Sequence, residues 1–447
     1  MKTKKQILII LMIITSFITG IIYSKPSYAT NSNVPAPNFT IHSQGAVLID
    51  SNSGKLLYGK NENQKLYPAS TTKILTAIIA IENCKPTDKI TASYDAVMSL
   101  PSGYSNAAIQ PGETIEFQDL LDMFLIQSAN EIGNIFAEHI SGSISDFAKL
   151  MNQKAAQLGC TNSHFTNPSG IHDTEHYSTA YDMALIAKYC MKNQTFRNTV
   201  SKSSCKIAAT DKYEERYFRN TNDLLNSSSK YYYKYAIGTK TGYTSQAKRC
   251  LIATSIKDNL ELITVVLGAD LSIPDKRYED TINLFEYGYK NYKIEKIATK
   301  NTIIEDLIIG NATKDTEKLS LVLKDDLTGI VPSNFNSSTL KGTVKLNDLI
   351  AAPIEEGAVL GKITYNIGEF EYSSDLVANH SVEEFNPLTV FGKITLAFFV
   401  LFVLSKILLP KKKSKKKLSK NRNSKKKKKR TKKNTNYKKS IDSIYKF

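Results

Sequence analysis

Apolar residues recur with helical spacing in three segments of the first third of the chain. Residues 73–81 are almost wholly apolar after their first position, and they predict a buried helix that begins near Ser70. Similar patterns over 120–125 and 132–140 flank the more polar stretch 126–131. We therefore predict that 126–131 is a short polar loop between two buried helices.

Strand-like patterns follow in the middle of the chain. Runs of β-favouring residues at 235–244, 249–256 and 260–267 are separated by short polar turns. Successive strands joined by tight turns pair side by side, so these three predict an antiparallel meander. With about 260 residues before the next region, the chain can bury a full core, and the fold class predicted is α/β (α+β), an antiparallel sheet flanked by helices.

A second folded region is predicted over residues 292–384. Its short strand-like runs include 302–304, 319–323 and 359–365, with turn residues between them. No motif with recognisable chemistry falls in this region. We predict a small all-β domain.

The N-terminus carries the pattern of an export signal. Basic residues precede an apolar run over 7–22, and small residues at 27–29 offer a cleavage site. This pattern predicts a signal peptide over 1–29, so that the mature chain begins near Thr30 outside the cytoplasmic membrane. An uncleaved anchor is the alternative.

The C-terminus carries the pattern of a membrane anchor. Residues 388–409 are apolar except for Lys393, Lys406 and a few small polar residues, and as a helix they would span about 33 Å, enough for a bilayer. The tail over 410–447 has 19 Lys and Arg against one acid, which leaves a net charge of −1 for everything before it. A basic tail directly after a span is typical of a cytoplasmic segment held by anionic lipids; nucleic-acid binding is the weaker alternative.

The first chemical motif is Ser70-Thr71-Thr72-Lys73 at the start of the predicted helix. A helix N-terminus favours the oxyanion that forms when a serine attacks a carbonyl group. Lys73 lies one turn from Ser70 on the same face, and burial would disfavour its ammonium form and make it a usable base. The alternative is a capped core helix with a lysine at its edge.

The second and third motifs are Ser128-Ala129-Asn130 and Lys240-Thr241-Gly242. In the polar loop, Ser128 can relay a proton and the Asn130 amide can hold a neighbouring group; helix capping is the alternative. On a strand that borders the site, Lys240 can attract a carboxylate and Gly242 permits close backbone approach. Protection of an edge strand by a lysine would explain Lys240 but not Gly242.

Together the three motifs resemble those of the D-alanyl-D-alanine carboxypeptidases, low-molecular-mass penicillin-binding proteins of the serine peptidase type. The resemblance extends to the segments 45–50, 167–173 and 176–182 and covers roughly residues 40–380. It implies a β-lactamase/transpeptidase-like catalytic domain over 30–291, followed by the all-β domain as a stalk. It also implies a peptidoglycan stem peptide as substrate, β-lactams as covalent inhibitors, and no cofactor. An apolar span departs from the amphipathic anchor common in this family.

The resemblance assigns roles to individual residues. It implies that Ser70 is the nucleophile, Lys73 the base, and Ser128 with Asn130 the proton relay. It also implies that five residues bind the substrate, at its carboxylate or at the oxyanion: Lys240, Thr241, Gly242, Tyr243 and Arg277. The backbone N–H of Tyr243 would be the second oxyanion donor. The predicted signal peptide and the predicted membrane span together indicate a cell-membrane protein with one C-terminal anchor and a catalytic domain that faces the cell wall.

Three other functions stay open at this point. Endopeptidase activity on cross-links would use the same motifs. A class A β-lactamase shares them too, but it needs a Glu-x-x-Leu-Asn segment after Asn130, which the sequence lacks. A wall-binding scaffold without activity is the non-enzyme alternative, and the intact motifs argue against it.

Histidines and cysteines do not change this picture. His172 and His176 could assist deacylation or form a hydrogen-bonded loop, and no metal site is expected. The five cysteines show no metal-ligand spacing and no assignable disulfide; Cys190 and Cys250 are expected in the core.

Overall fold

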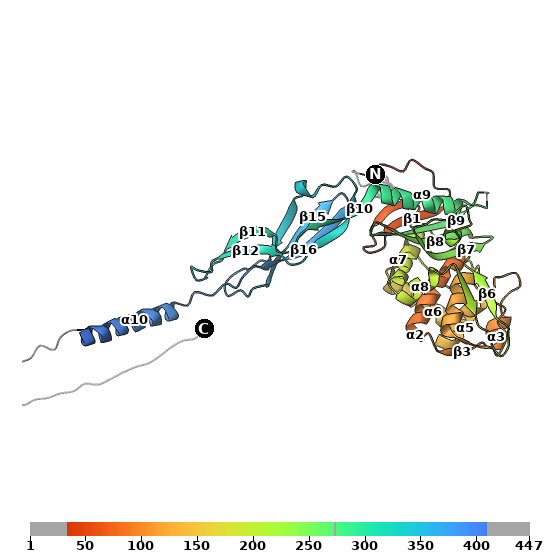
Figure 1. Ribbon diagram of the computed structural model, residues 1–447, viewed down its shortest axis with the longest axis horizontal. Coiled ribbons are helices and arrows are strands. Elements are labelled where there is room, and N and C mark those ends of the chain that lie inside the picture. The colour runs from red at the N-terminus through yellow and green to blue at the C-terminus, as the bar shows by residue number, and fades with distance from the viewer. Residues whose placement is uncertain (1–33, 272–273, 409–447) are drawn as a thin grey trace, which may run out of the picture. The chain divides into compact units, whose positions relative to one another are not determined.

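The computed structural model describes residues 34–271 and 274–408. Its first part is built on a five-stranded antiparallel sheet in the order β2-β1-β9-β8-β7 (Figure 1). β7 pairs with β8, and β8 pairs with β9, so the predicted meander is confirmed. The predicted signal peptide and basic tail lie outside the described residues. The strands are Gly45–Asp50 (β1), Leu56–Lys60 (β2), Ala236–Thr244 (β7), Lys248–Lys257 (β8) and Leu260–Ala269 (β9).

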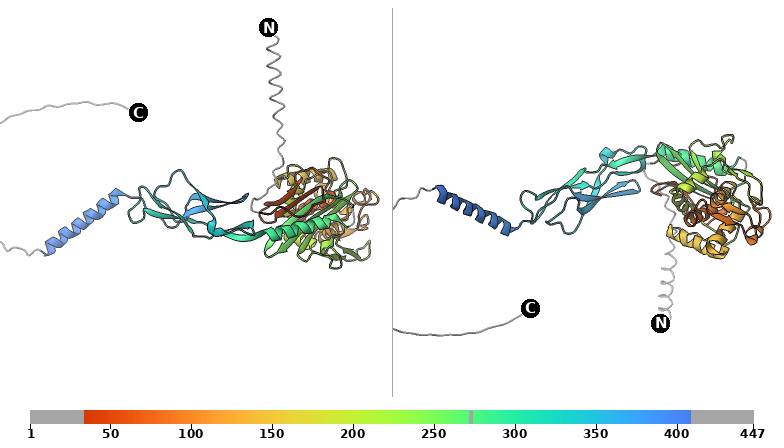
Figure 2. Two further views of the ribbon diagram at one scale, coloured as in Figure 1. Left: turned by 90° about the horizontal axis from the view of Figure 1, so that it is seen from above. Right: turned by 60° about the horizontal axis from the view of Figure 1, so that its bottom comes forward.

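Helices cover both faces of this sheet. α9 (Lys276–Asn291) packs on one face, and α7 (Ala180–Met191) packs on the other together with α2 (Lys73–Asn83) (Figures 1 and 2). Further helices lie on the same side of the sheet as α2 (Figure 1). They are α3 (Tyr94–Met98), α4 (Phe117–Asp122), α5 (Glu131–Ser141), α6 (Ile144–Gln157) and α8 (Gln194–Val200).

Strand β1 shows how the sheet separates two cores. Val47 and Ile49 belong to the core shared with α2 and α7, whereas Ala46 and Leu48 belong to the core under α9. Successive side chains of a strand point to opposite faces, so a strand covered on both faces reads as one continuous apolar run. This explains the uninterrupted apolar sequence of β1.

Helix α2 begins one turn later than its chemical motif. Residues Ala69–Thr72 form a single 3₁₀ turn, and α2 continues from Lys73. All residues from Lys73 to Ala80 are buried, because α5, α6, α7 and α8 surround the helix. The predicted buried helix is therefore confirmed, and its tight first turn places Ser70 at the start.

The predicted loop 126–131 is shorter than expected. A single π-helical turn over Met123–Gln127 extends α4, and α5 begins at Glu131. Only Ser128, Ala129 and Asn130 separate the helices, and Ser128 adopts a left-handed conformation with φ 68°. Apolar spacing cannot distinguish a π turn from the end of an α-helix, so the pattern placed Ile126 and Gln127 in the loop wrongly.

Two small hairpins lie beside the helices. β3 (Lys89–Thr91) pairs with β4 (Thr114–Glu116), and β5 (Ser204–Ile207) pairs with β6 (Arg216–Arg219). A buried ion pair, 2.7 Å between Glu113 and Arg216, joins the two hairpins. Loss of either partner would leave an uncompensated buried charge, so the pair holds the end of the 99–113 loop in place. A 3₁₀ turn, Asp223–Leu225, follows β6.

The region after α9 is all-β, as predicted. Five strands form one antiparallel sheet in the order β11-β12-β16-β15-β14, and β10 pairs with β13. The predicted runs near 302–304, 319–323 and 359–365 correspond to β11, β12 and β15. The strands are Tyr292–Ala298 (β10), Ile303–Ile308 (β11), Lys318–Leu323 (β12), Leu327–Pro332 (β13), Gly342–Leu346 (β14), Val359–Ile367 (β15) and Phe370–Ala378 (β16), with a 3₁₀ turn at Ser337–Thr339.

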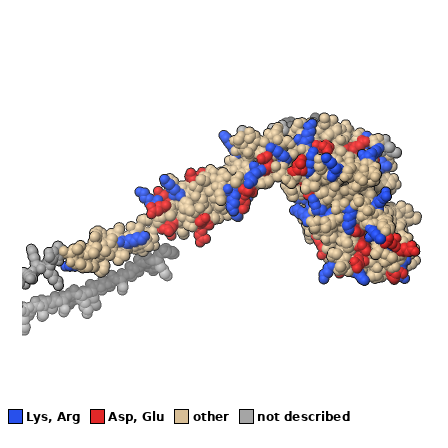
Figure 3. Space-filling view, viewed as in Figure 1, with Lys and Arg blue, Asp and Glu red and all other residues tan. Residues whose placement is uncertain are grey.

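Beyond Glu384 the chain forms a separate unit, whose described residues include the helix α10 (Pro387–Leu408). Its mean hydropathy is 2.2 over 18 residues, and among the described residues it is the one helix long and apolar enough to cross a membrane. On the face shown in Figure 3, basic and acidic side chains are interspersed over the chain before this helix. This mixture agrees with the near-zero net charge of the sequence before its tail.

Candidate active site

Ser70 lies on a strained and closely packed turn. The preceding residue, Ala69, has φ 48°, and its carbonyl oxygen would lie only 1.9 Å from a Cβ placed on Gly170. The Thr71 hydroxyl donates to the carbonyl of Pro68 at 2.6 Å and closes the turn. A left-handed alanine costs about 1–2 kcal/mol, so the surrounding contacts must hold this conformation. They fix the position of the Ser70 hydroxyl.

Lys73 is fully buried beneath Ser70. Its Nζ lies 2.9 Å from Ser70 Oγ, 2.7 Å from Asn130 Oδ1 and 2.9 Å from the carbonyl oxygen of Ser169. Burial, and then the positive charge of Lys240, hold the pKa of Lys73 well below its usual value. The sequence prediction that burial disfavours the ammonium form is confirmed.

The partners of Lys73 define where its lone pair points when it is neutral. A neutral amine has two N–H groups and one lone pair, and the oxygens of Asn130 and Ser169 can only accept. These two oxygens take the two N–H groups. The lone pair then faces the third neighbour, Ser70 Oγ, whose O–H can donate to it. In this arrangement Lys73 can remove the Ser70 proton directly.

The other two motif residues of the short loop behave differently from each other. Asn130 binds Lys73 through Oδ1 and donates from Nδ2 to the carbonyl of Ser105 at 2.8 Å. Ser128 is buried beside it. Within residues 34–271 and 274–408, no hydrogen bond joins the Ser128 hydroxyl to Lys73 or Lys240, so its relay role stays a prediction.

Strand β7 is the sheet edge that faces Ser70, and it carries the third motif. A Cβ on Gly242 would lie 3.1 Å from the backbone nitrogen of Ser70, so the missing side chain allows β7 to approach the turn. Thr241 Oγ1 is 2.7 Å from Thr221 Oγ1. Tyr243 is 53% exposed, so its side chain lies at the surface beside the turn.

Lys240 is buried rather than exposed, which argues against edge protection as its purpose. It is 1% exposed, and its Nζ donates to the carbonyl of Thr241 at 3.1 Å. Burial, and then the charge of Arg277, lower the pKa of Lys240 to about 7. Arg277 lies in the first turn of α9 and is 3.2 Å from a carboxylate oxygen of Asp275. The structure therefore brings two basic groups together at one side of β7.

His176 is part of a hydrogen-bonded loop. Its Nδ1 accepts from the backbone N–H of Thr166 at 3.1 Å, so Nε2 carries the proton and donates to Thr72 Oγ1 at 2.9 Å. Burial lowers its pKa to about 4, so it is neutral near pH 7. His172 contacts the ring of Tyr67 edge-on at 4.7 Å between centroids. Within the described residues, no group of three His, Cys, Asp or Glu side chains could hold a metal ion.

The five cysteines are free thiols in the described structure. Cys190 and Cys250 are fully buried, which confirms their expected place in the core.

Sequence reasoning missed two backbone carbonyls and one glycine in this site. The carbonyl of Ser169 binds Lys73, that of Ser105 binds Asn130, and Gly170 packs on the turn before Ser70. Ser169 and Gly170 lie in the family-like segment 167–173, which was the available signal. Nothing in a side-chain pattern marks the Ser105 carbonyl.

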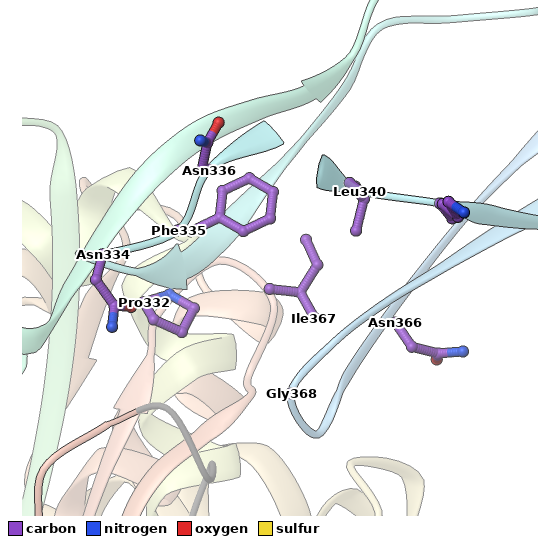
Figure 4. Close-up of a pocket in the computed structure, with 9 residues that line it drawn as sticks. Pro332, Asn334, Phe335, Asn336, Leu340, Asn366, Ile367 and Gly368 are labelled. Atoms are coloured by element: carbon purple, nitrogen blue, oxygen red, sulfur yellow. The ribbon is translucent and has the colours of Figure 1, made fainter. Parts of the chain in front are cut away.

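A separate cavity of about 460 Å³ lies in the all-β region (Figure 4). It is lined by the loop after β13 and by the turn between β15 and β16, with Phe335, Leu340 and Ile367 pointing into it. None of the motif residues borders it.

Comparison with known proteins agrees with this geometry. Residues 30–271 match the family described as D-alanyl-D-alanine carboxypeptidase, and residues 292–384 match the penicillin-binding protein 5 C-terminal domain. The chain is 30% identical over 374 residues to D-alanyl-D-alanine carboxypeptidase DacF of Bacillus subtilis (strain 168), covering 82% of this chain and 92% of that protein. It is 28% identical over 389 residues to DacA of Haemophilus influenzae, covering 85% of this chain and 94% of that protein.

A solved structure supports the same relationship. The crystal structure of penicillin-binding protein 5 from Haemophilus influenzae superposes with a TM-score of 0.65 at 27% identity, covering 78% of this chain and all of that one. Both parts of the described structure, the sheet with its helices and the all-β region, have counterparts among the family matches. The chain belongs to the D-alanyl-D-alanine carboxypeptidase family.

Proposed function

We propose that this serine D-Ala-D-Ala carboxypeptidase acts on peptidoglycan stem pentapeptides, with Ser70 as nucleophile and Lys73 as base. The observation that carries the proposal is the 2.9 Å contact between Lys73 Nζ and Ser70 Oγ, with the amine's two N–H groups directed to other acceptors. Burial lowers the pKa of this amine and so favours its neutral, proton-accepting form, which an ordinary lysine lacks at neutral pH.

Acylation follows from these positions. Ser70 Oγ attacks the carbonyl carbon of the penultimate D-Ala while its proton passes to Lys73 Nζ. The peptide C–N bond then breaks, and the leaving D-alanine nitrogen takes a proton from Lys73 through the Ser128 hydroxyl. Water attacks the resulting ester, the Ser70 oxygen recovers its proton, and the shortened peptide is released. β-Lactams acylate the same oxygen.

The developing oxyanion is placed between the nucleophile's turn and β7. The backbone N–H of Ser70 lies at the start of a helical turn, and β7 reaches it because Gly242 lacks a side chain. We assign the N–H groups of Ser70 and Tyr243 to the oxyanion. Two donors held by packed backbone need no rearrangement as charge develops.

The substrate's terminal carboxylate is assigned to Lys240, Thr241 and Arg277. Two cations share one side of β7, and the charge of Arg277 disfavours the charged form of Lys240 in the free enzyme. A carboxylate between them would relieve that repulsion and accept charge-assisted hydrogen bonds. This arrangement selects a peptide with a free C-terminus, which favours carboxypeptidase over endopeptidase activity.

The charge of Lys240 gives a pH dependence with a defined sign. Its charged form binds the carboxylate, and its pKa of about 7 means that the charge is lost above neutrality, so kcat/KM for a pentapeptide should fall as pH rises through 7.

Arg277→Gln removes the neighbouring positive charge. We expect kcat/KM to drop about 10- to 100-fold because a group that binds the carboxylate is lost. The pH at which kcat/KM falls on the alkaline side of its pH profile should also rise, because the pKa of Lys240 is no longer lowered by Arg277.

Lys276→Gln is the matched control for this pH profile. Lys276 precedes Arg277 but pairs with Glu279 at the surface, 2.7 Å away, so the same loss of charge occurs away from Lys240. The Lys276 variant should leave both kcat/KM and the alkaline side of its pH profile unchanged. An alkaline side that stays in place in the Arg277 variant would contradict the assignment.

The experiment that tests the whole function is product analysis with purified residues 30–384. A pentapeptide ending in D-Ala-D-Ala, a cross-linked dimer and penicillin are offered in parallel, and products are identified by mass spectrometry. We expect free D-alanine from the pentapeptide and a stable penicilloyl adduct. Cleavage of the dimer alone would indicate an endopeptidase, rapid penicillin turnover a β-lactamase, and no reaction from folded protein a scaffold.

We also propose the arrangement of the chain around the membrane. The catalytic domain covers 30–291, the all-β stalk 292–384, and the membrane span 388–409, of which residues 388–408 lie in α10. An apolar helix with no buried residue fits a lipid environment, and the basic tail would then lie in the cytoplasm. The catalytic domain would face the cell wall.

A further inference from the structure

The loop between α3 and β4 is fastened to the Ser128–Asn130 motif by its backbone. The carbonyl of Ser105 accepts from Asn130 twice, from the backbone N–H at 2.9 Å and from Nδ2 at 2.8 Å. Ser105 Oγ donates to the carbonyl of Gln127 at 3.0 Å. One exposed stretch of loop therefore contacts both ends of the short motif.

These contacts decide which way the Asn130 amide points. A backbone carbonyl can only accept, so the Ser105 oxygen selects the NH₂ side of the amide and leaves Oδ1 for Lys73. If the Ser105 carbonyl moved away, the amide could turn its NH₂ toward Lys73 and lose the acceptor that holds one of the lysine N–H groups. The lone pair of Lys73 would then no longer be directed at Ser70.

Glu131 holds this stretch of loop. Its Oε1 accepts from the backbone N–H of Ala107 at 2.6 Å, two residues beyond Ser105, and the side chain is 2% exposed. Its other oxygen, Oε2, has no hydrogen-bond partner among the described residues, and Glu131 lines a cavity of about 260 Å³ together with residues of the 97–109 stretch. The hydrogen bond from Ala107 holds the backbone two residues beyond Ser105, and the backbone groups of Ala107 and Ile109 in the same loop favour the charged form of the carboxylate.

We propose that Glu131 is a positioning residue for acylation: by anchoring Ala107 it keeps the Ser105 carbonyl on Asn130 and so keeps Lys73 directed at Ser70. Glu131 is also the first residue of α5, where a negative charge stabilises a helix N-terminus. The two roles need different properties of the side chain. Anchoring needs an acceptor of the right length, whereas helix stabilisation needs charge, as does the raising effect of Glu131 on the pKa of Lys73, which is weaker than the lowering effects of burial and Lys240.

Two variants separate length from charge. Glu131→Gln keeps an oxygen at the same distance from Ala107 and removes the charge, whereas Glu131→Asp keeps the charge but is one methylene shorter. We expect the penicillin acylation rate to fall at least about tenfold in Glu131→Asp and to stay within about threefold of the unsubstituted enzyme in Glu131→Gln, because small displacements of catalytic groups have large effects on rate. The opposite order would overturn the proposal.

A second pair of variants tests whether the effect passes through Asn130. In an Asn130→Ala background, Glu131→Asp should lower the penicillin acylation rate by less than about twofold, because there is no amide left to orient. An undiminished loss in that background would mean that Glu131 acts elsewhere, and thermal unfolding of each variant identifies any loss that comes from stability alone. This inference rests on the proposed function, whose own failure would appear as no adduct in the unsubstituted enzyme.

Discussion

Ser70→Ala is expected to abolish both D-alanine release and the penicilloyl adduct, a loss of at least about 10³-fold. Among the residues that the structure describes, no other hydroxyl lies in the position of Ser70 Oγ, 2.9 Å from the Lys73 amine and at the start of a helical turn. Water could in principle attack a bound substrate in the variant, but it would lack the fixed geometry of the covalent nucleophile. Residual activity should therefore be close to background.

The measurement is intact-protein mass spectrometry after incubation with penicillin, together with D-alanine released from the pentapeptide. Ser201→Ala, which removes an exposed hydroxyl just after α8, is the matched control and should acylate normally. The thermal midpoint of Ser70→Ala should differ little from that of the unsubstituted protein. A penicilloyl adduct that persists in Ser70→Ala would place the nucleophile on another residue.

Much of the site was predictable because its chemistry depends on side chains at short spacing. Ser70 and Lys73 are three residues apart on one helical segment, so their contact follows from helix geometry. Lys240 and Gly242 lie two residues apart on one strand. The short polar turns between successive strands predicted the meander to which that strand belongs. In each case a local rule and a distinctive residue type coincided, so the sequence pattern predicted the local structure in which these residues lie; their roles stay predictions.

The rest of the site depends on contacts that no local rule determines. The carbonyls of Ser105 and Ser169 reach the motif residues through the packing of distant loops, and any residue type can supply a carbonyl. The charge of Arg277 reaches Lys240 because tertiary packing brings the start of α9, which packs on β8 and β9, close to Lys240. Such contacts arise from tertiary packing, which the order of residues along the chain does not reveal on its own.

The same burial that makes Lys73 a base should make it a liability for stability. The folded protein lowers the pKa of Lys73 below its unfolded value near 10.4, so the unfolded chain binds more protons between the two values. The contribution of Lys73 to stability is therefore most unfavourable below its folded pKa and recovers as pH rises toward 10. Activity and stability place opposite demands on this one side chain.

Lys73→Met should consequently separate the two properties. Methionine has a similar shape but no charge or proton to transfer, so acylation should fall by at least about 10³-fold while the free energy of unfolding at pH 7 rises by about 1–2 kcal/mol. The gain stays small because Asn130 Oδ1 and the Ser169 carbonyl lose a donor. Denaturant unfolding from pH 7 to 10 provides the measurement.

The pH dependence of that gain is the decisive part of the test. The stability difference between Lys73→Met and the unsubstituted protein should shrink as pH approaches 10, because the lysine's penalty disappears once the unfolded chain also carries it neutral. Lys85→Met, at an exposed position just after α2, should show neither the loss of acylation nor the pH-dependent gain. A Lys73 variant destabilised by more than about 1 kcal/mol at pH 7 would show that the hydrogen bonds of the amine outweigh its desolvation, and Lys73 would then stabilise the fold as well as serve as its base.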